Sequence, residues 1–250
     1  MSVRLDVLFG AHEVTPQDVA GRVVAVIDVL RASTTIAAAL HAGARAVIPF
    51  ASTEEAATRA RGMDRDAVRL GGERKMLPIP GFDFGNSPAE YTPKSVGGKT
   101  LLFTTTNGTA ALVATQGARD VVVASFANFT AAGALLRAAL RGGNPVTLLC
   151  AGRDGHFSLE DAVCAGRLAK HLVQRNAKVQ LGDATLACQL LAKKFEHSLA
   201  RVFEQSEHGR ALVEAGFARD LEICATLDAY PVVPVYHDRQ VTKLGPDLVR

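Results

Sequence analysis

The sequence predicts an α/β protein with a mainly parallel central sheet. An unbroken apolar run stands at 23–27 and a mainly apolar one at 146–151, and such runs suit strands buried on both faces. Small or hydroxylated residues follow these runs, and Ala- or Leu-rich segments come next. Strand and helix signals alternate in quick succession between residues 23 and 61, which is the pattern of consecutive βα units.

The elements follow from these signals in chain order. We expect strands at 3–9, 23–27, 46–50, 99–103, 120–125, 146–151 and 232–237. We expect helices at 15–19, from Ser33 or Thr34 to Gly43, at 52–61, from Ala110 onward, at 129–140, 159–173 and 183–204, and within 206–226 with a break near Gly216. Pro234 lacks a backbone N–H donor, so the strand that contains it is expected at an edge of the sheet.

The span 70–93 interrupts this pattern. It contains four glycines and four prolines, so we expect no long regular element there. The span also carries Phe82 and Phe84, which favour burial, and an ordered loop that contacts a ligand is preferred to a purely structural excursion.

Composition excludes several classes of protein. The net charge is +3 and the charges are interspersed, which gives no polybasic tract for nucleic acid. No signal peptide or membrane span is apparent, so a cytoplasmic protein is expected. The four cysteines lie far apart without a CxxC pair, which favours buried thiols over zinc or disulfides. We expect a single α/β domain over 1–250, with the helical segment 182–230 as a candidate subdomain and its apolar face as a candidate homodimer surface.

A charged and hydroxylated turn follows the apolar run 23–27. In an open α/β sheet, ligands bind beyond the carboxyl ends of the strands, and helix N-termini favour anions. Asp28 is therefore a candidate ion ligand or base, with capping of backbone N–H groups as the alternative. Arg31 suits phosphate or sulfonate oxygens, and Ser33 and Thr34 are candidate substrate-binding hydroxyls.

A second turn of this kind begins in a run of three threonines. Thr106, Asn107, Gly108 and Thr109 could bring hydroxyl and helix N–H groups together around an anion, although a simple helix cap has the same residues. We interpret the turn as an anion-binding site.

Further arginines and histidines occur in other turns. Arg74 and Arg153 are candidate anion ligands, and ordinary surface arginines are the alternative for each. Of the seven histidines, His156 alone lies in such a turn. The other six are expected on the surface or on helices.

Four more carboxylates are candidates for magnesium. Asp161 and Ser158 have the spacing of a capping box, which leaves Glu160 free. Glu73 and Asp83 lie in the glycine- and proline-rich span. Mg²⁺ binds through a few carboxylates and retains waters, so these groups are plausible ligands.

Common phosphate-handling motifs fail in detail. The tetrad at 97–100 resembles the end of a P-loop, but Pro93 occupies the first glycine position and a strand follows the tetrad. Cys150 and Arg153 lack the spacing of a thiol phosphatase. No second aspartate stands two residues after Asp28, as an aspartyl-phosphate mechanism would require.

With these segments in view, the chain resembles the 2-phosphosulfolactate phosphatase (ComB) family of coenzyme M biosynthesis. The resemblance lies in VIDVLRASTTIAAAL, GGER, GFDFGNSP, TTTNGTAAL and AGRDGHFSLEDAVCAG, which span 26–166. It implies a ComB-like three-layer α/β/α fold and Mg²⁺-dependent hydrolysis of 2-phosphosulfolactate to sulfolactate and phosphate. The run KMLP at 75–78 departs from the family, where a glycine is expected soon after GER.

The resulting hypothesis is a Mg²⁺-dependent phosphomonoesterase acting on a small anionic phosphorylated substrate. Asp28, with Glu160 or Asp161, would hold the metal and orient water. Arg31, Arg74 and the turn 107–109 would bind the substrate and stabilise the leaving oxygen. Direct water attack and a phosphoenzyme both remain open. The alternatives are a phosphatase for another small phosphorylated hydroxy acid and a non-catalytic anion-binding protein.

Overall fold

The computed structural model describes residues 2–174 and 179–245. Its strands are β1 Val3–Leu8, β2 Val23–Ile27, β3 Ala46–Pro49, β4 Val68–Arg74, β5 Leu77–Pro78, β6 Thr100–Thr104, β7 Asp120–Ala124, β8 Val146–Cys150, β9 Val179–Leu181, β10 Pro234–His237 and β11 Gln240–Lys243. Its α-helices are α1 Pro16–Val19, α2 Ala32–His41, α3 Thr53–Arg61, α4 Pro93–Val96, α5 Gly108–Ala114, α6 Phe129–Arg141, α7 Leu159–Val173, α8 Asp183–Lys194, α9 Ala200–Gln205, α10 Glu207–Glu214 and α11 Ala218–Ala225. Three short 3₁₀ helices are η1 Ala11–Glu13, η2 Pro88–Glu90 and η3 Phe126–Asn128.

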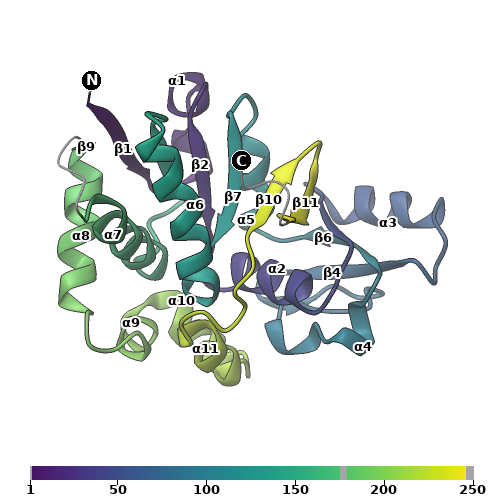
Figure 1. Ribbon diagram of the computed structural model, residues 1–250. Coiled ribbons are helices and arrows are strands. Elements are labelled where there is room, and N and C mark those ends of the chain that lie inside the picture. Colours follow the sequence, from purple (N-terminus) through teal and green to yellow (C-terminus); the bar gives the residue numbers. More distant parts are fainter. Residues whose placement is uncertain (1, 175–178, 246–250) are drawn as a thin grey trace.

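The strands form one sheet in the order β5-β4-β6-β3-β11-β10-β7-β2-β8-β1-β9. It consists of two parallel blocks, β9-β1-β8-β2-β7 and β3-β6-β4. The antiparallel hairpin β10–β11 joins them, pairing antiparallel with β7 on one side and with β3 on the other. In Figure 1, β2 and β7 run from top to bottom, whereas β4 and β6 run from side to side.

This arrangement decides where a site can form. Three successive antiparallel pairings separate the two blocks, so in a flat sheet their carboxyl ends would lie at opposite edges. The blocks instead lie across each other (Figure 1), and the turn after β6 reaches the turn after β8. There, Asn107 Oδ1 accepts a hydrogen bond from the backbone N–H of Asp154 at 3.0 Å.

Helices cover both faces of the first block. Val23, Ala25 and Ile27 of β2 belong to the core that includes α6 and α7, whereas Val24 and Val26 belong to the core that includes α2 and α5. Successive strand residues point to opposite faces, so an unbroken apolar run is what a doubly covered strand requires. The three-layer α/β/α prediction is confirmed.

The span 70–93 is more regular than its composition predicts. Gly71 and Gly72 lie inside the seven-residue strand β4, so the expectation that no long element occurs there is wrong. A side chain at Gly72, whose φ is +133°, would collide with the backbone of Thr104 in β6. Here glycine permits close approach of two strands and does not mark a loop. Phe82 and Phe84 are partly buried against core residues, as expected.

Two further expectations need correction. Pro234 lies in an interior strand, because β10 is paired on both sides. Pro234 is the first residue of β10, a position that proline tolerates, and Val235 makes the pairing with Val122 of β7. The helix expected at 183–204 is divided into α8 and α9, and Arg167 donates to the carbonyl of Glu196 between them at 2.5 Å.

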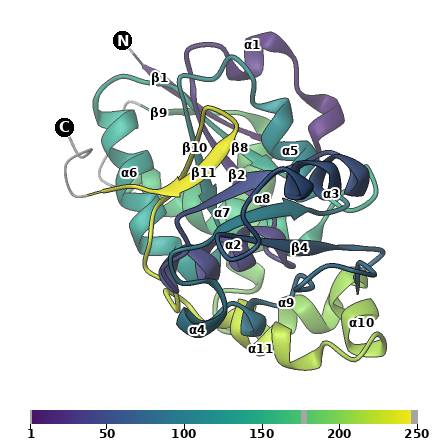
Figure 2. The ribbon, with the colours of Figure 1, turned by 90° about the vertical axis from the view of Figure 1, so that its right-hand side faces the viewer.

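The C-terminal helices gather at one end of the molecule. Figures 1 and 2 both show α9, α10 and α11 at the lower end, where α11 contacts η2. Within the ranges 2–174 and 179–245, no helix has both the length and the apolar character needed to cross a membrane. A homodimer through these helices stays a prediction.

Candidate active site

A pocket of about 420 Å³ lies where the turns of the two blocks meet. Six of the predicted site residues line it: Asp28, Arg31, Glu73, Thr106, Asn107 and Arg153. They come from turns after β2, β6 and β8 and from the end of β4, so residues distant in the sequence share one cavity. Lys75 and His208 also line this pocket, and neither was predicted as a site residue.

Asp28 is held at the end of β2 by its own turn. The backbone N–H of Ala32 donates to Oδ1 at 3.1 Å, and Ser33 Oγ accepts from the backbone N–H of Asp28 at 2.9 Å. A Cβ at Gly108 would lie 2.7 Å from Oδ2, so α5 can begin here only with glycine. Burial raises the pKa of Asp28 to about 6, although the charge of His208 opposes the shift. Asp28 therefore exchanges a proton more readily near neutral pH than an exposed aspartate does.

Asp161 holds two of these turns in place. Its Oδ1 accepts from the backbone N–H of Val29 at 2.9 Å, and its Oδ2 accepts from that of Gly152 at 3.2 Å. Ser158 Oγ accepts from the Asp161 N–H at 3.3 Å, which is one half of the predicted capping box. The other half is absent, because the carboxylate is committed to Val29 and Gly152. Burial, reinforced by the charge of Asp28, raises the pKa of Asp161 well above its usual value.

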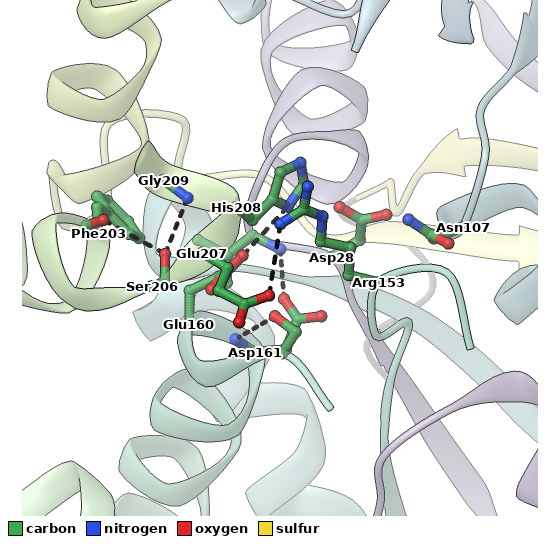
Figure 3. A network of polar contacts seen from close by, with 12 residues as sticks. Asp28, Asn107, Arg153, Glu160, Asp161, Phe203, Ser206, Glu207, His208 and Gly209 are labelled. Carbon is green, nitrogen blue, oxygen red and sulfur yellow. Dashed lines mark hydrogen bonds and ion pairs between the residues drawn. The ribbon is translucent and has the colours of Figure 1, made fainter. Parts of the chain in front are cut away.

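Glu160 lies beside Asp161 on α7 and faces α10. Its Oε1 is 3.2 Å from His208 Nδ1, and the two side chains are 2% and 14% exposed. Among the described residues, Oε1 accepts no hydrogen bond of good geometry, so the approach of His208 Nδ1 is a close contact and not a well-formed hydrogen bond. Figure 3 shows this pair beside Asp28 and Arg153. Sequence reasoning placed His208 among ordinary helix residues, because nothing local connects α10 with α7.

Arg31 enters the pocket already paired. Nη1 donates to Asp220 Oδ2 of α11 at 2.7 Å, and Nη2 donates to the carbonyl of Met76 at 2.8 Å. The guanidinium also lies 4.2 Å from the ring centroid of Phe217. Ser87 Oγ donates to the other oxygen of Asp220 at 2.5 Å. Arg31 thus binds the C-terminal helices to the site, and its charge is largely neutralised.

Two other cations of the pocket, Arg153 and Lys75, lack a close acidic partner among the described residues. Arg153 has distant acidic neighbours, with Asp154 at 3.9 Å and Glu207 at 4.0 Å. Lys75 is exposed at the tip of the β4–β5 hairpin and makes no ion pair or side-chain hydrogen bond with the described part of the chain. Both Lys75 and Met76 have positive φ, of 51° and 71°. Paired positive φ values are typical of a two-residue hairpin turn.

Glu73 joins this hairpin to the turn after β6. Its carboxylate accepts from the backbone N–H and hydroxyl of Thr106 at 2.7 and 3.1 Å, and from the backbone N–H of Met76 at 2.8 Å. These bonds fix the hairpin over the pocket. A carboxylate offers about four lone-pair positions, so Glu73 retains capacity for one more partner.

The chain is similar in sequence to known proteins of one family. A family model described as 2-phosphosulpholactate phosphatase matches residues 9–239. This chain belongs to that family. Proteins named "Probable 2-phosphosulfolactate phosphatase" from Symbiobacterium thermophilum and Clostridium acetobutylicum are 43% and 35% identical to it. The alignments cover 91% and 96% of this chain, and 97% and 100% of those proteins. The predicted resemblance is confirmed, and the chain is a phosphoric monoester hydrolase by family.

Some residues predicted for this phosphatase site lie elsewhere. Arg74 Nη2 donates to Thr104 Oγ1 at 2.7 Å, on the side of β4 opposite Glu73, because neighbouring strand residues alternate. Asp83 is exposed, and its Oδ2 accepts from the Leu70 N–H at 2.8 Å. Three buried hydroxyls, of Ser33, Thr34 and Thr109, donate to nearby backbone carbonyls and do not line the pocket.

The oxygen ligands that the pocket offers can be compared with those that Mg²⁺ usually binds. In residues 2–174 and 179–245, no group of three or more His, Cys, Asp or Glu side chains is placed to hold a metal. Asp28 and Glu73 are nevertheless two carboxylates on one pocket, and Asp28 Oδ2 accepts no hydrogen bond from the described residues. Mg²⁺ in phosphoryl-transfer sites is usually bound by one or two carboxylates, waters and substrate phosphate. The pocket fits an ion of that kind.

Proposed function

We propose that this protein is a Mg²⁺-dependent phosphatase that hydrolyses 2-phosphosulfolactate to sulfolactate and inorganic phosphate. One observation carries the proposal. Two buried carboxylates, Asp28 and Glu73, share a pocket with two weakly paired cations, Lys75 and Arg153. The cations suit a substrate with several anionic groups, and the carboxylates suit a metal that such a substrate helps to bind. The names of the relatives support the same substrate.

In this proposal Asp28 and Glu73 hold the metal. The bound ion supplies Lewis-acid polarisation of the phosphoryl group. Arg153 and Lys75 bind the remaining anionic groups and orient the ester. Asn107, whose side-chain oxygen accepts a hydrogen bond from the backbone N–H of Asp154, holds the turns after β6 and β8 together at the edge of the pocket. Arg31 maintains the pocket wall through Asp220.

The acidic side of the pocket favours catalysis over simple anion capture. An anion-binding protein has no use for carboxylates beside its ligand, because like charges repel the anion. Here Asp28 and Glu73 line the same pocket, and Glu160 and Asp161 lie behind it. Metal-assisted hydrolysis gives the pocket carboxylates a function.

The test is release of phosphate from 2-phosphosulfolactate with magnesium, with EDTA, and after magnesium is restored. We expect EDTA to lower turnover about 100-fold and added magnesium to restore it, since a metal contributes several kcal/mol to such reactions. Asp28→Asn should lower kcat about 1,000-fold. Asp83→Asn is the control, because its carboxylate lies outside the pocket.

Each outcome is decisive for one part of the proposal. Turnover that survives EDTA removes the metal from the mechanism, and normal turnover by Asp28→Asn removes Asp28. A panel that includes 2-phospholactate tests the substrate. A marked preference for another phosphorylated hydroxy acid would replace 2-phosphosulfolactate, and binding without turnover of any ester would indicate an anion-binding protein.

A further inference from the structure

We propose that His208 is the general acid of the reaction and that Glu160 is the residue that positions it. The inference rests on the proposed phosphatase function and extends it to a residue of the C-terminal helices. It assigns to α10 a part in the chemistry, whereas the residues of the proposed function come from strand ends and the turns that follow them.

The geometry of the pair has three parts. Glu160 is almost fully buried, and its Oε1 lies 3.2 Å from Nδ1 of His208. His208 lines the same pocket as Asp28 and Arg153. Because Nδ1 is the ring nitrogen beside Glu160, we assign proton donation to the other ring nitrogen, Nε2. An acid behind one imidazole nitrogen is a common way of orienting the ring and stabilising its charged form.

The position of His208 is fixed by the start of its helix. Ser206 Oγ accepts from the backbone N–H of Gly209 at 2.9 Å, which caps the first turn of α10. A Cβ at Gly209 would collide with the backbone of Phe203 in α9, so the two helices approach closely at this point. The residue between Ser206 and Gly209 that faces inward is His208, and its neighbour Glu207 reaches toward Arg153 instead.

The reaction needs such a group. The departing oxygen of a phosphorylated hydroxy acid is an alkoxide, a strong base that leaves poorly without a proton. When the P–O ester bond breaks, its electron pair stays on that oxygen, and the Nε2 proton of His208 transfers to it. Water supplies the new oxygen on phosphorus and releases one proton, and His208 regains one from solvent. One ester and one water thus give one alcohol and one phosphate.

Neutralisation of Glu160 alone would not explain the arrangement. A histidine serving only that purpose would be equally effective if it were sealed in the core, whereas His208 opens onto the cavity that holds the other candidate groups. The two explanations differ in one measurable respect. A general acid matters in proportion to the basicity of the leaving group, and a structural histidine does not.

The experiment uses a matched pair of esters: 2-phosphosulfolactate and its 3,3-difluoro analogue, whose fluorines make the leaving alkoxide a weaker base. For His208→Gln we expect kcat to fall about 100-fold on the first ester and less than about 10-fold on the second. Glu160→Gln should show the same selectivity with a smaller loss. The control is His237→Gln, because His237 also lies near an acid, with Nδ1 3.5 Å from Asp238, but is exposed outside the pocket.

Equal losses on the two esters, or no loss, would overturn the assignment. Wild-type protein that hydrolyses neither ester would defeat the phosphatase proposal itself, so the two failures are distinguishable. If His208→Gln unfolds, Glu160→Gln gives the leaving-group readout. In addition, His208→Ala should regain turnover of 2-phosphosulfolactate when imidazole is added, and absence of rescue counts against a proton-transfer role.

Discussion

The pocket has two walls of different origin. The strand wall, formed by Asp28, Glu73, Asn107 and Arg153, is carried by strand ends and the turns after them. Backbone N–H groups hold three of these side chains, those of Asp28, Glu73 and Asn107. The helix wall is formed by His208 and by the Arg31–Asp220 pair, which depend on α10 and α11. The carboxylates of the first wall are held by backbone N–H groups, whereas the groups of the second wall are held by ionisable side chains of other elements.

This difference has an energetic consequence. Backbone N–H groups stabilise a buried carboxylate without a counterion, so the strand wall can keep negative charge. The helix wall instead pairs each buried charge with an opposite one, which makes it sensitive to the loss of a single partner.

The largest effect is expected from unpairing the helix wall. Arg31→Met leaves Asp220 buried without its cation and should lower the free energy of unfolding by about 3–5 kcal/mol, measured by urea denaturation. Arg31→Met with Asp220→Leu should regain most of that loss. The control is Lys170→Met, because the Lys170–Glu196 pair is exposed and screened by solvent and should contribute little to stability. A double variant no more stable than Arg31→Met would contradict this account.

The strand wall should make the stability of the protein depend on pH. The pKa of Asp28 is about 6 in the folded protein, whereas an unperturbed aspartate has a pKa of 3.8. Between these values the folded state binds more protons than the unfolded state, so its stability falls as pH rises from about 4 to about 6. The fall attributable to Asp28 is ~3 kcal/mol in metal-free buffer. Urea midpoints of wild type and Asp28→Asn should diverge across this range, and parallel curves would refute the assignment.

The smallest effect is expected at the hairpin above the strand wall. Lys75 is exposed, so its charge is partly screened, and Lys75→Met should lower kcat/KM for 2-phosphosulfolactate about 10-fold, near 1.4 kcal/mol. We expect a smaller loss for 2-phospholactate, which lacks the sulfonate. Lys94→Met on α4 serves as the control. Equal losses for the two esters would show that Lys75 does not recognise the sulfonate.

The sequence predicts the strand wall well because its information is local. The apolar run 23–27 identifies a doubly covered strand, and polar residues directly after strands mark the edge where ligands bind. Asp28, Asn107 and Arg153 were found in this way, and all three line the pocket. The roles assigned to them stay predictions.

The helix wall could not be found in this way. His208 becomes a pocket residue only because α10 packs near α7, and no spacing within the sequence encodes that contact. Strand β4 was missed for a related reason, since Gly72 is required by its approach to β6 and not by a turn. Likewise, Pro234 suggests an edge until β11 is known to pair beside it.

The hairpin β10–β11 has a consequence for biosynthesis. In the sheet order of residues 2–174 and 179–245 it joins the two blocks, yet it follows the other nine strands along the chain. Until the ribosome has released β10, β7 presents an open edge, and until it has released β11, β3 presents one; such an edge is a template for pairing with other chains. Truncation upstream of β10 should therefore yield an aggregating product, because the two blocks can join only after β10 and β11 have been made.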